Sequence, residues 1–369
     1  MRVLLLVGHQ DGGMVHYTSQ LANAASKLED VTLFGPEGLN EGYFDSDVAI
    51  ETVSHSPLAE KFGKNLMSVS RLVSKVRSHD PDLIHVLSAH PSIGAGMGFF
   101  RKYPIVSTIH DPIPPTATRK VHYLLMSLNE LTKQLYFYFS DELIVHGEAM
   151  RGPLEKRGGA ASKISTIQHG NYSLFTRWRD DNISEEGNTI LFFGYIAEHK
   201  GVEYLFRAER KITEQVADAK IIVAGKGNLQ KYRKFMGDPD RYEIHNGYIP
   251  NEKVTRLFQR ASTVVLPYTS ATQSGVLSIA YTFGKPVVAT NVGSLPEVVD
   301  DERTGLLVPP GDAEALAGAV IELLTQDECR LRMGDRARQM AESDLSWERI
   351  ARRTVTLYRS VLQENGEPT

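Results

Sequence analysis

The sequence has very little cysteine: Cys329 is the only one among 369 residues. A single cysteine excludes an internal disulfide and fits a reducing compartment, so we expect a cytoplasmic protein. Cys329 stands in the polar stretch QDECRLR, where no partner for catalysis is evident. We therefore predict that this thiol is chemically inert.

A strong charge of one sign and long apolar runs are also missing. The net charge of −4 leaves no basic footprint, so nucleic acid is not an expected partner. No uninterrupted apolar run reaches the roughly 18 residues that a membrane-spanning helix needs. The N-terminal MRVLLLVGHQDGG has too short an apolar run for a signal peptide and predicts a buried first strand instead.

Short apolar runs alternate with amphipathic segments of helical length along the chain. The runs are rich in Val and Ile and apolar throughout, which is typical of parallel strands buried on both faces. They are Val3–Val7, Leu83–Val86, Ile105–Ile109, Leu143–Val145, Ile164–Ile167, Ile190–Phe193, Ile221–Ala224, Thr263–Leu266 and Pro286–Ala289. Because the chain is also too long for one ordinary core, the sequence predicts an α/β fold with two Rossmann-like, doubly wound domains.

The strand–helix alternation breaks in the polar stretch 171–187, which predicts a linker. The expected domains are therefore 1–170 and 188–345, and the chain ends in a predicted helix at 346–365. Ligands of doubly wound sheets bind beyond the carboxyl ends of the strands. The residues that follow each apolar run are therefore the candidate site residues.

Two candidate positions follow strands in the first half. Gly12 and Gly13 open a helix after the first run, and glycines there let a ligand approach the helix N terminus. Their spacing is not G-x-G-x-x-G, so the dinucleotide fingerprint is absent, and a simple tight turn is the alternative. His110 follows the run Ile105–Ile109, where it can hydrogen-bond a substrate; a surface histidine is the alternative.

The second half contains a candidate phosphate site. Lys200 lies in GYIAEHKG at the start of a helix, and a cation beside unpaired backbone N–H groups suits a phosphate. Ser274, Gly275 and Val276 begin another helix, whose positive end would meet a diphosphate. For Lys200 taken alone, a solvated surface lysine is the alternative.

Several segments together resemble the GT4 family of retaining glycosyltransferases. They are GKPVVATNVGSLPEVVDDERTGLLVPPGD, FFGYIAEHKG, VSTIHDP and SWERIARRTVTLY, and the resemblance covers nearly the whole chain. It implies the GT-B fold, in which two Rossmann-like domains face each other across a cleft and the last helix crosses back to the first domain. It also implies sugar transfer from a nucleotide sugar with retention of anomeric configuration, without a bound metal or cofactor.

The resemblance assigns roles to individual residues. His110 and Lys200 are the expected catalytic residues, in contact with the donor sugar and the diphosphate respectively. The residues expected to bind the donor phosphates and sugar are Gly12, Gly13, Gly194, Tyr195, Gln273, Ser274, Gly275 and Val276. The residues expected to bind the nucleotide are Gly225, Lys226, Gly227, Tyr248 and Ile249.

The sequence departs from the family pattern at three positions. The family usually has two glutamates with seven residues between them, but Ala271 and Ile279 stand at those places. The family usually also has an arginine after the glycine that is Gly194 here, and this chain has Tyr195. We interpret the chain as an active transferase with altered recognition of ribose and sugar, in which Thr272 and Gln273 supply neutral hydrogen bonds.

The expected partners are a UDP-, GDP- or ADP-sugar donor and a glycan, lipid-linked or small-molecule acceptor. The basic amphipathic stretches 60–80 and 119–140 predict either packed helices or contact with an anionic membrane surface, which would make the protein peripheral on the inner face of the membrane. The alternatives are a nucleotide-sugar epimerase or phosphorylase on the same scaffold, and a non-catalytic subunit. No cofactor lysine for a phosphorylase is identifiable.

Overall fold

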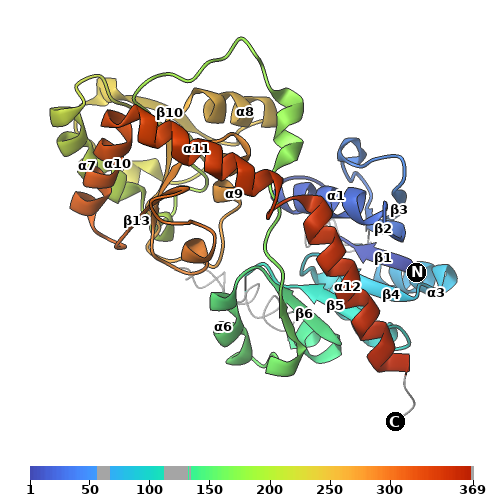
Figure 1. The fold of residues 1–369 in the computed structure, drawn as a ribbon. Helices are drawn as coiled ribbons and strands as arrows, with labels where there is room; N and C mark the ends of the chain where they lie inside the picture. The colour runs from blue at the N-terminus through green and yellow to red at the C-terminus, as the bar shows by residue number, and fades with distance from the viewer. Residues whose placement is uncertain (56–66, 112–131, 133, 367–369) are drawn as a thin grey trace. The chain divides into compact units, whose positions relative to one another are not determined.

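The computed structural model describes residues 1–55, 67–111, 132 and 134–366. The chain divides into two compact units, Met1–Gln168 with Trp347–Thr369, and His169–Ser346. Each unit is built on one parallel sheet with helices on both faces (Figure 1). The predicted α/β class with two doubly wound sheets is therefore confirmed.

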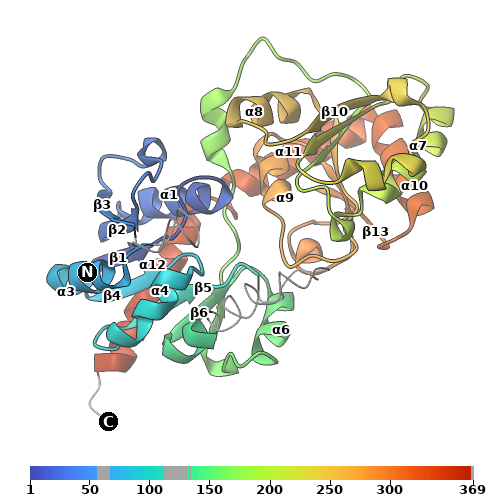
Figure 2. The ribbon, with the colours of Figure 1, turned by 180° about the vertical axis from the view of Figure 1, so that it is seen from behind.

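The first unit contains a seven-stranded parallel sheet in the order β3-β2-β1-β4-β5-β6-β7. Its strands are β1 (Arg2–Leu6), β2 (Asp30–Pro36), β3 (Ala49–Val53), β4 (Leu83–Val86), β5 (Ile105–Thr108), β6 (Glu142–Val145) and β7 (Ile164–Thr166). Its described helices are α1 (Gly13–Ala25), α3 (Val69–His79), α4 (Pro91–Gly96), α6 (Arg151–Glu155) and α12 (Trp347–Gly366). The helices α1 and α12 pack against each other on one face, and α3 and α4 cover the other (Figures 1 and 2).

The second unit contains a six-stranded parallel sheet in the order β10-β9-β8-β11-β12-β13. Its strands are β8 (Thr189–Phe193), β9 (Lys220–Gly225), β10 (Tyr242–Asn246), β11 (Thr263–Leu266), β12 (Val287–Thr290) and β13 (Gly305–Val308). Its helices are α7 (Val202–Gln215), α8 (Asn251–Arg260), α9 (Gly275–Thr282), α10 (Ala313–Thr325) and α11 (Asp327–Glu342). The stretch 171–187, predicted as a linker, belongs to this unit, and the 3-10 helix η5 (Ser173–Trp178) within it packs beside α8.

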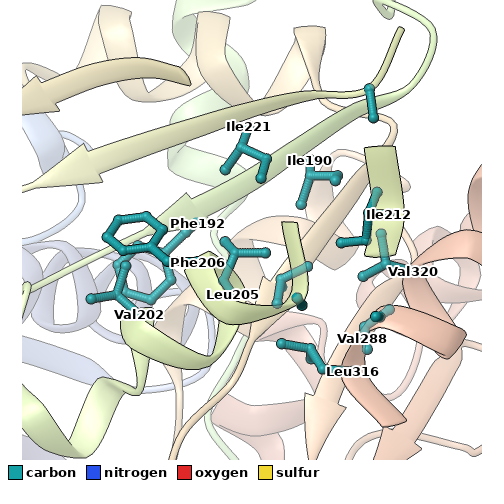
Figure 3. Packing of buried hydrophobic residues seen from close by; sticks show 14 of the residues in the cluster. Ile190, Phe192, Val202, Leu205, Phe206, Ile212, Ile221, Val288, Leu316 and Val320 are labelled. Carbon is teal, nitrogen blue, oxygen red and sulfur yellow. The ribbon is translucent and has the colours of Figure 1, made fainter. Parts of the chain in front are cut away.

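The inner strands of the second unit, β8, β9, β11 and β12, are largely apolar because both faces of the sheet are covered there. Ile190 and Phe192 of β8 face one core with Leu205 of α7 and Leu316 of α10 (Figure 3). Leu191, between them, belongs to the opposite core, which α8, α9 and α11 complete. Successive side chains of a strand alternate between faces, so a strand covered on both sides needs apolar residues at every position.

The strands β2 and β3 were not foreseen by the apolar runs. In β3 the middle residues Ile50, Glu51 and Thr52 are only half-buried. This strand lies at the edge of the sheet, where Glu51 accepts a hydrogen bond from Lys75 Nζ at 2.7 Å. A mixed polar and apolar strand of this kind lacks the continuous apolar signal of the central strands.

The last helix is fastened to the first sheet by buried polar contacts. His85 of β4 is fully buried, with Nδ1 2.5 Å from Tyr358 Oη of α12 and Nε2 2.8 Å from Thr108 Oγ1 of β5. Arg353 of α12 donates to the Thr166 carbonyl oxygen at 3.0 Å. Burial, with the nearby histidines His110 and His146, lowers the pKa of the His85 imidazole to about 3.

We predict that His85 makes the first unit acid-sensitive. The folded pKa lies below the unfolded one, so the unfolded state binds more protons between pH 6.5 and 3 and the free energy of unfolding falls as pH drops through this window. Between about pH 7.5 and about pH 5, we expect His85→Gln to lose about 2 kcal/mol less stability than the parent. Urea unfolding followed by Trp347 fluorescence, in a Trp178→Phe background, measures this unit alone.

A matched control is Tyr358→Phe, which removes one His85 contact and leaves the imidazole in place. This variant is expected to be less stable at both pH values while it keeps the acid-sensitivity. Equal pH dependence in the parent and in His85→Gln would contradict the assignment.

Candidate active site

The predicted donor-site residues of the second unit lie at one edge of its sheet. Strand β8 has β9 on one side and β11 on the other, so the chain order reverses there, which is where doubly wound sheets bind ligands. The residues that follow β8 are Gly194, Tyr195 and Lys200, while Gly225 ends β9 and Lys226 and Gly227 follow it. Tyr248 and Ile249 follow β10, and Gln273, Ser274, Gly275 and Val276 follow β11.

The turns after β8 and β9 are joined through their backbones. The Gly194 N–H donates to the Ala224 carbonyl at 2.9 Å, and the Ile196 N–H donates to the Lys226 carbonyl at 2.9 Å. Gly225 has a φ of 150°, and a Cβ there would overlap the Gly194 carbonyl oxygen. Only glycine allows this close approach, so the glycine-rich turn predicted from the sequence fixes the distance between the two strand ends.

Two tyrosines at this edge are exposed. Tyr195 is 70% exposed after β8, and Tyr248 is 72% exposed after β10. Exposed aromatic side chains of this size are uncommon on a surface and suit a contact with a planar or apolar ligand group. The turn after β10 is held in place because the Gly247 N–H donates to the Gly225 carbonyl at 3.2 Å.

The start of α9 and Lys200 form the positively charged part of the edge. Ser274 is the N-cap of α9, and its Oγ accepts a hydrogen bond from the Leu277 N–H at 3.4 Å. Lys200 Nζ lies 3.8 Å from the ring centroid of Tyr268, which is itself fully buried. A cation near the N-terminal end of a helix is an arrangement that attracts phosphate groups. Sequence reasoning did not identify Tyr268.

Two buried polar atoms beside α9 lack hydrogen-bond partners in the described part of the chain. They are Oε1 of Gln273 and Oγ of Ser294. Their loops are neighbours, since the Ser294 N–H donates to the Thr272 carbonyl at 3.1 Å. Buried polar atoms are nearly always paired in folded proteins, so these two are candidates to meet ligand hydroxyl groups. Ser294 follows β12 and was not predicted.

The two positions that lack the family's acids differ in their surroundings. Ile279 of α9 is buried in the apolar core beside Leu277 and Tyr281. Ala271 is partly buried and packs against the same core. A carboxylate at position 279 would be desolvated among apolar side chains, which costs several kcal/mol unless it is paired. The substitution at this position is therefore consistent with the packing around it.

The predicted residues of the first unit lie at the carboxyl edge of its own sheet. Gly12 is the N-cap of α1, which begins at Gly13, directly after β1. His110 follows β5, and its Nε2 lies 2.9 Å from the Leu87 carbonyl oxygen while its Nδ1 lies 3.1 Å from His146 Nε2. Both ring nitrogens of His110 therefore already have protein partners. Its predicted contact with a donor sugar stays a prediction.

The pair His110–His146 is placed between two main-chain carbonyls. Nδ1 of His146 lies 2.9 Å from the Ile167 carbonyl oxygen, at the opposite end from the Leu87 carbonyl. Each carbonyl requires an N–H and the contact between the rings requires one more, so three protons satisfy all three contacts. Two neutral rings carry only two N–H groups, one fewer than the three contacts need. Burial, with His110 as the second cause, lowers the pKa of the His146 imidazole to about 3. Sequence reasoning missed His146.

The basic stretches predicted to contact a membrane are only partly described. Residues 69–79 of the first stretch form α3, where Leu72 and Val76 point into the core and Lys75 pairs with Glu51 at 2.7 Å. In the second stretch, 119–131 and 133 lie outside the described residues. Membrane contact stays a prediction.

Across residues 1–55, 67–111, 132 and 134–366, no helix combines the length and apolar character needed to cross a bilayer. The same ranges contain no group of three or more His, Cys, Asp and Glu side chains placed to hold a metal ion.

Two family profiles match the chain. The family described as Glycosyltransferase Family 4 matches residues 11–170, and the family described as Glycosyl transferases group 1 matches residues 187–326. Together the two profiles span most of both units.

Individual known proteins are similar over different lengths. An uncharacterized glycosyltransferase of Methanocaldococcus jannaschii is 28% identical over 191 residues, which are 51% of this chain and about half, 49%, of that protein. The glycogen synthase of Mycobacterium tuberculosis is 25% identical over 301 residues, covering 79% of this chain and 72% of that one. Anabaena HepE, solved in complex with UDP-glucose, has a TM-score of 0.72 at 17% identity, covering 98% and 100% of the two chains. The structural likeness confirms the predicted GT-B fold.

We predict that the turn after β9 tolerates no side chain at Gly225. Because a Cβ there overlaps the Gly194 carbonyl, Gly225→Ala should destabilise the second unit by about 2 to 4 kcal/mol. Urea unfolding followed by Trp178 fluorescence, in a Trp347→Phe background, measures this unit.

The matched control is Gly318→Ala, on the exposed side of α10, where a Cβ meets nothing within 4 Å. That change should stabilise the unit by about 0.5 to 1 kcal/mol, because alanine favours a helix interior over glycine. Equal stabilities of the two variants would show that the turn is not constrained as described.

Proposed function

This chain belongs to the family 4, or group 1, glycosyltransferases, and from that membership we propose that it transfers a sugar from a nucleoside diphosphate sugar. The anomeric carbon would leave the phosphate oxygen and bond to an acceptor oxygen, whose proton is released to the departing diphosphate or to water. We propose that the product keeps the anomeric configuration of the donor. The acceptor is a glycan, a lipid-linked glycan or a small molecule.

One observation carries the proposal: a lysine and a capped helix end at the strand-order reversal of the second sheet. Lys200 follows β8 and α9 begins after β11, and these two strands are neighbours. In the described residues, no carboxylate lies within 4.0 Å of the Lys200 ammonium. Its charge is therefore not neutralised by a salt bridge, which suits a site for a diphosphate.

The proposed reaction needs positive charge where the leaving diphosphate gains negative charge. Fixed donors at such a position are usually the largest contribution to catalysis. Lys200 and the first N–H groups of α9 supply this charge, so the proposed chemistry needs no bound metal or cofactor. HepE, which is similar to this chain in fold, was solved in complex with UDP-glucose, a donor of the proposed class.

The proposed donor-sugar contacts use neutral groups in place of carboxylates. Gln273 follows β11, and its buried Oε1 lacks a partner in the described residues. An amide can both accept from and donate to sugar hydroxyl groups, whereas a carboxylate only accepts. We propose that this difference changes which sugar is preferred. The base is proposed to lie near Tyr248 and Ile249, which follow β10.

Lys200→Ala tests the phosphate site. Loss of a preorganised charged donor should lower turnover by about 100- to 1,000-fold. It should also weaken UDP, GDP or ADP binding by about 10- to 100-fold. Nucleotide release from a panel of UDP-, GDP- and ADP-sugars measures turnover, and titration calorimetry measures the dissociation constant.

Lys220→Ala is the matched control, because Lys220 is exposed at the start of β9, at the opposite edge of the same sheet. Lys220→Ala removes the same charge and should leave turnover and nucleotide affinity unchanged. Unchanged turnover and affinity in Lys200→Ala would end the phosphate assignment. Failure of the parent to bind any of the three nucleotides would favour the non-catalytic subunit, and interconversion of donor sugars without transfer would favour an epimerase.

Gln273→Leu separates the sugar from the diphosphate. We expect kcat/KM for transfer to fall about 10-fold, since one hydrogen bond to a sugar hydroxyl is lost. Affinity for the nucleoside diphosphate alone should stay within about 2-fold, because the amide is not proposed to contact it. Equal weakening for the nucleotide and the nucleotide sugar would place Gln273 at the phosphates instead.

A further inference from the structure

The turn that carries Lys200 rests directly on the segment that follows β11. The Thr269 N–H donates to the His199 carbonyl at 2.9 Å. Gly201, next to Lys200, has a φ of 64°, and a Cβ there would overlap the Pro267 carbonyl oxygen. The two backbones therefore touch on both sides of Lys200, and its side chain starts from a fixed position.

The Tyr268 ring lies beneath the Lys200 ammonium, at 3.8 Å from Nζ to the ring centroid. The ring is fully buried, so it cannot swing away from the lysine. Its Oη lies 3.2 Å from Ser274 Oγ, the atom that caps α9. The Tyr268 carbonyl accepts a hydrogen bond from Thr290 Oγ1 at 2.6 Å, which ties the residue to β12.

An aromatic ring holds an ammonium group differently from a carboxylate. The negative face of the ring attracts the cation, but the ring carries no net charge and leaves the positive charge in place. The nearest acid in the turn, Glu198, is engaged with Lys231 at 2.8 Å. A carboxylate partner would instead compete with an incoming phosphate for Lys200.

Building on the proposed function, we infer that Tyr268 is a positioning residue for diphosphate binding. Its ring orients Lys200 without neutralising it, and its hydroxyl group links that lysine to the Ser274 cap of α9. The cation and the helix end are thereby held as one unit, ready for a diphosphate of a nucleotide. Binding then needs little ordering of the lysine side chain, which otherwise costs affinity.

The test compares UDP binding and turnover in four proteins: the parent, Tyr268→Leu, Lys200→Ala and the double variant. Tyr268→Leu removes the aromatic face and should weaken UDP binding about 5- to 30-fold, with a matching rise in KM. In the Lys200→Ala background the same change should have little further effect. A Tyr268 that only fills the core would weaken binding equally in both backgrounds, and that result would overturn the inference.

Because Tyr268→Leu leaves a cavity, a second series keeps the shape of the ring. Phenylalanine and its mono-, di- and trifluorinated analogues are placed at position 268, which progressively removes the negative charge on the ring face. UDP affinity should fall a few-fold for Tyr268→Phe, which loses the hydroxyl contact with Ser274, and fall further in steps with fluorination. An affinity that does not change along the series overturns the inference.

The outcome also distinguishes this inference from the proposed function. If Lys200→Ala leaves the affinity for UDP, GDP and ADP unchanged, the phosphate site itself is wrong. If Lys200→Ala weakens binding while the fluorinated series is flat, the phosphate site stands and the role of Tyr268 does not. Trp178 fluorescence confirms that the second unit is folded in every variant.

Discussion

The parallel pairing of strands in both sheets is the constraint on which the rest of this structure depends. Parallel strands must be joined by crossover helices, so both faces of each sheet are covered and every strand ends at the same edge. Few polar groups other than paired ones such as His85 lie within such a sheet, and most gather beyond the strand ends. In the second unit this brings the turns after β8, β9, β10 and β11 together. The candidate active site is therefore a consequence of topology before it is a consequence of any single side chain.

Electrostatics then explains how the edge of the second sheet can work without the family's two acids. Ile279 is buried among apolar residues, so that place is not suited to a charge, while Ala271 is partly buried beside the same core. The positive groups remain in place: Lys200 rests on the ring of Tyr268, and Ser274 caps α9. In the proposed function, anion binding and sugar selection would thus be carried by different residues. A change in the sugar contacts need not disturb the phosphate contacts.

The sequence was informative wherever the signal was local. The central strands were found because burial on both faces demands continuous apolar residues, and the glycine-rich turn at Gly225 was found because its conformation requires glycine. The edge strand β3 was missed because its half-buried positions accept polar residues such as Glu51. Tyr268, Ser294 and His146 were missed for another reason. Their partners are distant in the sequence and meet only because β8 lies beside β11, β11 beside β12 and β5 beside β6.

The return of α12 to the first sheet has a consequence for synthesis on the ribosome. All seven strands of that sheet precede the second unit in the chain, but the helix that contacts His85 follows it. The second unit can therefore close while the nascent first unit still exposes the face that α12 will cover. That exposed apolar surface is where chaperones would bind during translation. The first unit, whose strands come early in the chain, is thus the last to be completed.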